Sequence, residues 1–291
     1  MKAKKFLAFV LVAVLALGTF GLAGCGNGDD EVSETPAGPT GSITVEGSDT
    51  MVNLGQALAE VFMDEFGGVD ISVAGGGSGT GIASLINGTV DLANSSRPIK
   101  DEEVDQAEAN GVDVTEFVVA YDGIAVVVNP SLEVEDLTFE QLGAIYRGEI
   151  TNWSEVGGPD LDIVLLARDS SSGTYDFILE HVIQQDDDEA VYSPNARLLP
   201  STQGIVDETI ANEAAIGYVG LGYLVPEIKV LKIDGVEANV DTVKDGSYSV
   251  SRPLFMYAAG TLSEASQAYI DWILSDEGQA VVAQIGFVTT N

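Results

Sequence analysis

Three short loops rich in Gly, Ser and Thr constrain this chain most, because each stands between a strand pattern and an amphipathic helical pattern. They read GSDT (47–50), GGGSGTG (75–81) and RDSSSGT (168–174). A helix N-terminus offers backbone N–H donors that lack intrahelical partners, together with the positive end of the helix dipole. Glycine lets the backbone approach a ligand closely, and Ser or Thr adds a hydroxyl group. Three such loops, one of them carrying an arginine, predict a site for a small tetrahedral anion.

Short β-branched segments alternate with helical patterns along the chain, which is typical of an α/β fold. The pattern predicts strands at 42–46, 70–74, 90–94, 163–167, 215–218, 228–233 and 248–250. It predicts helices at 51–66, 82–86, 101–110, 138–146, 175–183, 203–211, 263–274 and 277–285. Ser263 and Ser275 are the expected N-caps of the last two helices.

Two longer apolar segments are candidates for crossings between two lobes. Residues 116–129 are too many for one ordinary strand, and Asp122-Gly123 interrupts them, so we expect two collinear strands there. Residues 253–258 are the second candidate. Two α/β lobes joined by two crossings place a ligand in the cleft between the lobes.

The first 24 residues predict a signal peptide, with a basic region at Lys2, Lys4 and Lys5 and an apolar region at 6–17. The apolar region is too short for a transmembrane anchor. The small residues before Cys25 resemble a bacterial lipobox, which implies cleavage before Cys25 and lipid attached to it. The polar residues that follow indicate a flexible tether over 25–41.

Composition narrows the function. The chain holds 46 acidic and 12 basic residues, a net charge of −34. Nucleic-acid binding requires a basic surface, so nucleic acid is not an expected partner. The acidity also repels anions at long range, so an anion site must act through local dipoles and one or two arginines. Solubility and a salty habitat are the alternative explanations of the acidity. Cys25 is the single cysteine, which excludes an internal disulfide and a thiolate metal site.

Several motifs resemble a known family. They are VEGSDTMVNLGQALAEVF, GGGSGTGIASLINGTVDLANSSRPI, FVVAYDGIAVVVNP, ITNWSEVGGPD, VLLARDSSSGTYDF, LLPSTQGIV, AIGYVGLGYL, SRPLFMY and ILSDEGQAVVAQIGFV. Together they are similar to the phosphate-binding lipoproteins of bacterial phosphate ABC transporters, the Pst system, over nearly all of residues 42–291. The resemblance implies a two-lobed α/β fold of the periplasmic-binding-protein type II class. The first lobe would comprise 42–122 plus 256–291, and the second 123–255.

The resemblance also implies which residues hold the anion. The family binds dehydrated phosphate through loops at helix N-termini and one arginine, which is Arg168 here. The positions that match its binding residues are Thr50, the backbone N–H of Met51, Ser78, Ser96, Arg168, Ser172, Gly173 and Thr174. Arg97, next to Ser96, is expected to add a second cation.

Ser96 departs from the family pattern, because many members have an aspartate there that accepts the proton of monohydrogen phosphate and rejects sulfate. Serine accepts a hydrogen bond but lacks the fixed charge. Asp122 at the first crossing is our expected proton acceptor, with Asp49 and Asp169 as alternatives. Phosphate is therefore the expected ligand, and a sulfate-like oxyanion is the alternative.

The rival class is an enzyme. Ser172 as a nucleophile needs a base within hydrogen-bond reach, and the single histidine, His181, lies nine residues further along the next helix. Arg147 and Arg252 are interpreted as structural or rim residues. We therefore expect a receptor without cofactor, metal or enzymatic activity. It would be monomeric, lipid-anchored to the outer face of the cytoplasmic membrane, and would deliver phosphate to the permease subunits of an ABC importer; a signalling or adhesion role stays open.

Overall fold

The computed structural model describes residues 38–291. The predicted signal peptide (1–24), the predicted lipidation site Cys25 and most of the predicted tether lie outside the described residues. The last residue of that tether, Gly41, already belongs to the first strand. Among residues 38–291, no helix is both long enough and apolar enough to cross a bilayer.

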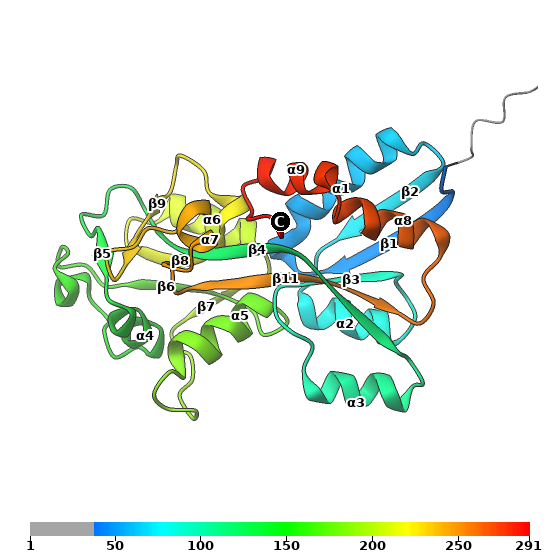
Figure 1. Ribbon diagram of the computed structural model, residues 1–291. Coiled ribbons are helices and arrows are strands. Elements are labelled where there is room, and N and C mark those ends of the chain that lie inside the picture. The colour runs from blue at the N-terminus through cyan, green and yellow to red at the C-terminus, as the bar shows by residue number, and fades with distance from the viewer. Residues whose placement is uncertain (1–37) are drawn as a thin grey trace, which may run out of the picture. The chain divides into compact units, whose positions relative to one another are not determined.

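Strands and helices alternate along the chain (Figure 1). The strands are β1 (Gly41–Gly47), β2 (Val69–Ala74), β3 (Leu92–Ser95), β4 (Val114–Val128), β5 (Asp136–Leu137), β6 (Val164–Arg168), β7 (Arg197–Leu199), β8 (Ala215–Gly220), β9 (Lys229–Val230), β10 (Lys232–Ile233) and β11 (Ser251–Ala259). The α-helices are α1 (Val52–Glu65), α2 (Ser78–Ile86), α3 (Asp101–Ala109), α4 (Phe139–Arg147), α5 (Gly173–Ile178), α6 (Thr202–Ala211), α7 (Val240–Lys244), α8 (Glu264–Ile273) and α9 (Asp276–Gln284). Single turns are η1 (Asp49–Met51), η2 (Trp153–Val156), the π-helical η3 (Leu179–Ile183) and η4 (Leu221–Tyr223).

The main sheet has the strand order β2-β1-β3-β11-β4-β8-β6-β7, with β9 paired to β4. At one end β1 is parallel to β2 and β3, and at the other end β6 is parallel to β7 and β8. The antiparallel pair β4 and β11 joins these two parallel groups, and Figure 1 shows the two strands running beside each other. These are the two crossings expected from the sequence.

Three groups of apolar side chains form the interior. The first core lies between α1, α8, α9 and one face of β1, β3 and β11. The second core lies on the other face, under α2 and α3. Successive residues of a strand point to opposite faces, so Leu254 and Met256 enter the first core while Phe255 and Tyr257 enter the second. The third core lies around β6, β8 and the second half of β4.

The fold class is confirmed, and so are most of the expected elements, including both serine N-caps: Ser263 accepts from Ser266 N and Ser275 from Gly278 N. The lobe boundaries stay a prediction. The third core draws on residues 124–250 and on Val288, which belongs to the predicted first lobe.

Three strand predictions were wrong in detail. Residues 116–128 lie in one continuous strand, because Asp122 and Gly123 keep their places in the ladder opposite Arg252 and Ser251. Glycine at 123 serves close packing instead of a turn: a Cβ there would lie 2.6 Å from the Val243 Cγ2 atom. The segment 228–233 is broken into β9 and β10, and residues 248–250 belong to no strand.

Candidate functional site

The three loops and the NSSRP segment (94–98) lie at the carboxyl ends of strands. GSDT follows β1, GGGSGTG follows β2, NSSRP continues β3, and RDSSSGT follows β6. Parallel strands bring their carboxyl ends to the same edge of a sheet, which is where open α/β sheets bind ligands. The α-helices α2 and α5 begin within their loops, at Ser78 and Gly173, and α1 follows GSDT after η1.

Six buried hydroxyl groups gather at these ends, and we call them the hydroxyl cluster: Ser48, Thr50, Ser78, Ser96, Ser172 and Thr174. Ser96 Oγ accepts from Ser48 Oγ at 2.9 Å and lies 3.3 Å from Ser78 Oγ. The Ser96 backbone N–H donates to Ser78 Oγ at 3.0 Å. This part of the hydroxyl cluster joins three loops of the first parallel group.

The third loop enters the hydroxyl cluster from the other parallel group. Thr174 Oγ1 lies 2.9 Å from Thr50 Oγ1, and Thr174 N donates to Ser172 Oγ, the N-cap of α5. A Cβ atom on Gly173 would lie 2.5 Å from Ser78 Oγ and 2.8 Å from Ser96 Oγ. Only glycine therefore allows this helix start to approach both serines.

Arg168 is buried at the end of β6, as expected, and its guanidinium holds four protein acceptors. Nη2 forms an ion pair with Asp49 Oδ2 at 2.8 Å and donates to Pro200 O. Nη1 donates to Thr202 Oγ1, and Nε donates to Leu199 O. Arg168 therefore ties RDSSSGT to GSDT through a carboxylate.

Arg97 points its guanidinium toward acidic partners. Its Nη atoms donate to both carboxylate oxygens of Glu103 at 2.6 and 2.7 Å, and its Nε lies 2.9 Å from Asp176 Oδ2. Lys100 Nζ lies 3.0 Å from the same Asp176 oxygen. Hydrogen bonding to Glu103 raises the pKa of Arg97, although burial opposes it. The expected role of Arg97 as a second cation for the ligand stays a prediction. Its guanidinium already has two acidic partners, Glu103 and Asp176.

Three other expected positions also have protein partners. The Met51 N–H donates to Ser48 O at 3.0 Å. Asp169, an alternative proton acceptor, accepts from Ser171 N and Ser171 Oγ within its own loop. Asp49, the other alternative, is the partner of Arg168.

Arg252 is the residue that the sequence reasoning missed, since it was interpreted as a structural or rim residue. It lies on β11, is 4% exposed, and donates from Nη2 to Thr174 Oγ1 at 2.8 Å and to Thr50 Oγ1 at 3.5 Å. Its position in SRPLFMY, one residue before the apolar segment 253–258, was a usable signal. Which strand face it would occupy depended on pairing with β4.

Asp122 lies opposite Arg252 in the β4–β11 ladder and is fully buried. Its Oδ2 atom is 3.5 Å from Arg252 Nη2, and its Oδ1 accepts from Leu221 N. Burial raises the pKa of Asp122 to about 6, against the lowering effect of Arg252. Burial lowers the pKa of Arg252 to about 10, so the guanidinium stays charged at neutral pH.

The hydroxyl groups of this cluster and the guanidinium of Arg252 are hydrogen-bond donors, which is the chemistry that an oxyanion site requires. Among the hydrogen bonds within residues 38–291, the Ser172 hydroxyl pairs only with Thr174 N, and His181 is exposed on η3, where its Nδ1 lies 3.2 Å from Phe177 O. Within residues 38–291, no group of three or more His, Cys, Asp or Glu side chains is arranged to hold a metal ion.

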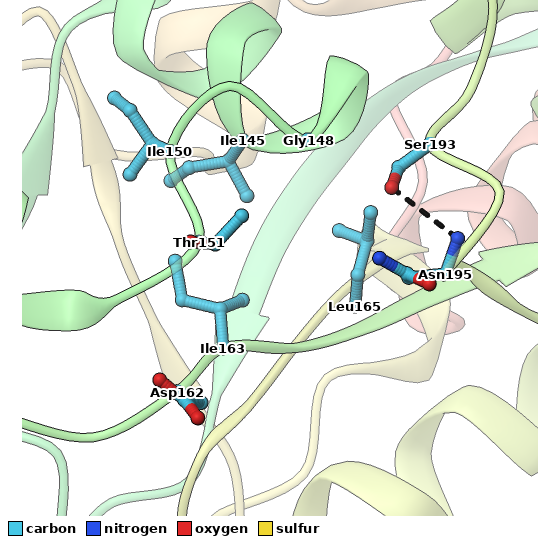
Figure 2. Close-up of a pocket in the computed structure, with 9 residues that line it drawn as sticks. All are labelled: Ile145, Gly148, Ile150, Thr151, Asp162, Ile163, Leu165, Ser193 and Asn195. Carbon is cyan, nitrogen blue, oxygen red and sulfur yellow. Dashed lines mark hydrogen bonds between the residues drawn. The ribbon is translucent and has the colours of Figure 1, made fainter.

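A separate pocket of about 430 Å³ lies away from the loops, beside α4 and β6 (Figure 2). Ile145, Ile150, Ile163 and Leu165 line it, together with polar residues such as Asp162 and Ser193. None of the predicted binding residues lines it, so it is not the anion site.

Comparison with known proteins places these features in a family. A family model described as a PBP superfamily domain matches residues 32–277. The phosphate-binding protein PstS of Staphylococcus epidermidis is 34% identical over 284 residues, which cover 93% of this chain and 86% of the relative. PstS of Staphylococcus aureus (strain USA300) is 32% identical over 292 residues, covering 96% of this chain and 85% of the relative.

Solved structures of phosphate-binding transport proteins are also similar to this chain. A putative phosphate ABC transporter substrate-binding protein with bound phosphate from Clostridium perfringens superposes with a TM-score of 0.80 at 34% identity, covering 86% of this chain and all of that one. An ABC-type phosphate transport receptor from Vibrio cholerae gives a TM-score of 0.69 at 28% identity, with the same coverage.

Proposed function

The chain belongs to the PBP superfamily and, within it, to the PstS family of phosphate-binding proteins, and on this premise we propose that it captures inorganic phosphate for an ABC importer. The observation that carries the proposal is the hydroxyl cluster, in which loops from both parallel groups of strands meet. An entering oxyanion would exchange hydroxyl–hydroxyl bonds for stronger, charge-assisted hydrogen bonds.

The proposed ligands are the predicted binding residues: Thr50, the Met51 N–H, Ser78, Ser96, Arg97, Arg168, Ser172, Gly173 and Thr174. The start of α2 and the loop at the start of α5 add helix-terminal N–H groups. Asp122 is the proposed proton acceptor, since its Oδ2 is buried and makes no hydrogen bond within residues 38–291. Of the alternative carboxylates, Asp49 forms a 2.8 Å ion pair with Arg168, and Asp169 accepts from Ser171 Oγ.

Capture would proceed by closure of two lobes on the anion. Contacts between the loops of the two parallel groups support this: Gly79 N donates to Ser171 O, Ser171 Oγ donates to Gly76 O, and Tyr223 Oη donates to Asp49 O. A ligand that contacts both lobes favours the closed conformation by its differential affinity for that conformation. The division into a first lobe of residues 42–122 plus 256–291 and a second lobe of residues 123–255 is part of this proposal.

The function is binding without catalysis. Hydrolysis of a phosphate ester would need a nucleophile with an adjacent base, and the Ser172 hydroxyl instead accepts the Thr174 N–H. We further propose that the mature protein is monomeric and extracytoplasmic, is held at the outer face of the cytoplasmic membrane by lipid on Cys25, and docks on the importer's permease subunits.

Isothermal titration calorimetry with inorganic phosphate tests the proposal. We expect a dissociation constant in the micromolar range or below, of the order of −8 kcal/mol in binding free energy. Titration with sulfate and phosphate in competition across pH 5 to 8 separates the two oxyanions. Tighter binding of sulfate would favour the alternative ligand, and binding of neither anion below the millimolar range would refute the receptor function.

A further inference from the structure

The family resemblance provides one arginine for the anion, yet a second arginine is more closely associated with the hydroxyl cluster. Arg252 Nη2 reaches Thr174 Oγ1 and Thr50 Oγ1, one hydroxyl from each parallel group of strands. Its Nη1 donates to Gly173 O at 3.3 Å, at the first residue of α5. Arg252 therefore contacts the start of α5 and both threonines, at the point where the two parallel groups of strands meet.

Arg168 differs in how its donors are used. All three of its guanidinium nitrogens hold acceptors that belong to the protein, and its Nη2 is paired with the Asp49 carboxylate. Its positive charge is thus matched by an adjacent negative charge. Within residues 38–291, Arg168 donates no hydrogen bond to the hydroxyl cluster.

The guanidinium of Arg252 is incompletely satisfied. Its Nε atom is buried and makes no hydrogen bond within residues 38–291. The oxygen of its carboxylate partner, Asp122 Oδ2, lies 3.5 Å from Arg252 Nη2. A buried N–H without an acceptor is costly, and the cost is removed when an acceptor arrives. Guanidinium offers paired N–H groups whose geometry matches two oxygens of a phosphate.

Neighbouring side chains hold Arg252 in place for such a contact. Its Cζ atom lies 5.4 Å from the centre of the Phe177 ring on α5, within the range of a cation–π interaction. Asp122 faces it across the ladder, and the strand itself fixes its backbone. A cation fixed in this way loses little freedom when it binds a ligand.

We propose that Arg252 contacts the bound oxyanion directly and adds its positive charge to the site. This inference rests on the proposed function, because it concerns the same anion. It assigns to β11, the second crossing strand, a direct part in ligand binding. The alternative is that Arg252 only neutralises the buried Asp122 carboxylate.

A pair of charge-matched variants separates the two roles. Arg252→Gln alone removes the cation and leaves Asp122 buried and unpaired, so a loss of binding by about 100-fold or more is expected under either role. The double variant Arg252→Gln/Asp122→Asn removes both charges and leaves no unpaired ion. If Arg252 contacts the oxyanion, the double variant folds but binds phosphate more than about tenfold more weakly than Asp122→Asn alone, a reference that already includes any loss of the proposed proton acceptor.

Calorimetry with inorganic phosphate provides the readout, and circular dichroism with thermal melting confirms that each variant is folded. Arg252→Lys keeps the charge but not the paired geometry, so its affinity should fall between those of the unchanged protein and of Arg252→Gln. Arg197→Gln is the matched control, because Arg197 is an exposed arginine with a partner at 3.6 Å; its affinity should not change.

A double variant that binds phosphate within about tenfold of Asp122→Asn alone would overturn the inference, because neutralisation of Asp122 would then explain Arg252. Failure of the proposed function looks different: the unchanged protein would itself not bind phosphate. If the double variant did not fold, Arg252→Lys would decide alone. An affinity equal to that of the unchanged protein would overturn the inference, and a loss of about tenfold or more would support it.

Discussion

Thr50 and Thr174 are 124 positions apart in the chain, and their hydroxyl oxygens lie 2.9 Å from each other. Thr50 follows β1 and Thr174 is the second residue of α5, so this single contact joins the two parallel groups of strands at the hydroxyl cluster. An anion that binds here touches both groups, which is the condition for coupling binding to closure.

Gly173→Ala should impair binding by steric exclusion. Its Cβ would lie 2.5 Å from Ser78 Oγ and 2.8 Å from Ser96 Oγ, so the start of α5 must move away from the serines. We expect phosphate affinity to fall by about tenfold or more in calorimetry. Gly67→Ala is the control, since a Cβ there meets nothing within 4 Å. Equal affinities of the two variants would contradict the close approach.

Arg168→Gln should leave the Asp49 carboxylate without its ion-pair partner, where the Asp49 side chain is only 13% exposed. The free energy of unfolding should fall by about 2 to 4 kcal/mol in urea denaturation. Adding Asp49→Asn should recover part of the loss, because the unpaired charge is then removed. If Asp49→Asn instead lowered stability further by its full individual amount, the two residues would not be coupled.

Asp176→Asn should speed release of phosphate. Asp176 on α5 is paired with Arg97 and Lys100, which follow β3, so it stabilises the approach of the two groups of strands. Loss of the pairs should raise the dissociation rate about fivefold in stopped-flow measurements, with little change in the association rate. Asp207→Asn, exposed on α6, is the control and should leave both rates unchanged. An unaltered dissociation rate for Asp176→Asn would remove these ion pairs from the closing mechanism.

Asp122 should make stability depend on pH. Burial raises its pKa from 3.8 to about 6, so between these values the folded protein keeps a proton that the unfolded chain has lost. The free energy of unfolding should therefore fall as pH rises from about 4 to 6, by on the order of 3 kcal/mol from this group. Denaturation curves across pH 4 to 7 measure it, and Asp122→Asn should lack this component. Identical pH profiles for the two proteins would contradict the assignment.

Ser96→Asp should increase discrimination between phosphate and sulfate. Ser96 is fully buried against Ser48 and Ser78, so a carboxylate there would face the anion at short range. A fixed negative charge accepts the proton of monohydrogen phosphate and repels fully ionised sulfate. The ratio of the two affinities should rise at least about tenfold in competition titrations. An unchanged ratio would show that position 96 does not set selectivity.

Local sequence signals predicted the elements of the fold well. Serine N-caps, alternating apolar residues and glycine-rich loops act over a few residues, so Ser263, Ser275 and the three loops could be placed without knowledge of the tertiary structure. The errors occurred where a local signal competed with pairing. The Asp122-Gly123 turn signal was overridden by the ladder that β4 forms with β11.

The sequence by itself determined the α/β class and the loops that carry the hydroxyl groups, because both follow from residue types at short spacing. Only the tertiary structure decided which charged group accompanies which loop. Arg168 pairs with Asp49, Arg97 with Glu103 and Asp176, and Arg252 joins Thr50 and Thr174. The physical reason is that a long side chain finds its partner through strand register and packing between residues far apart in the chain, and neither is encoded in the neighbourhood of the arginine itself.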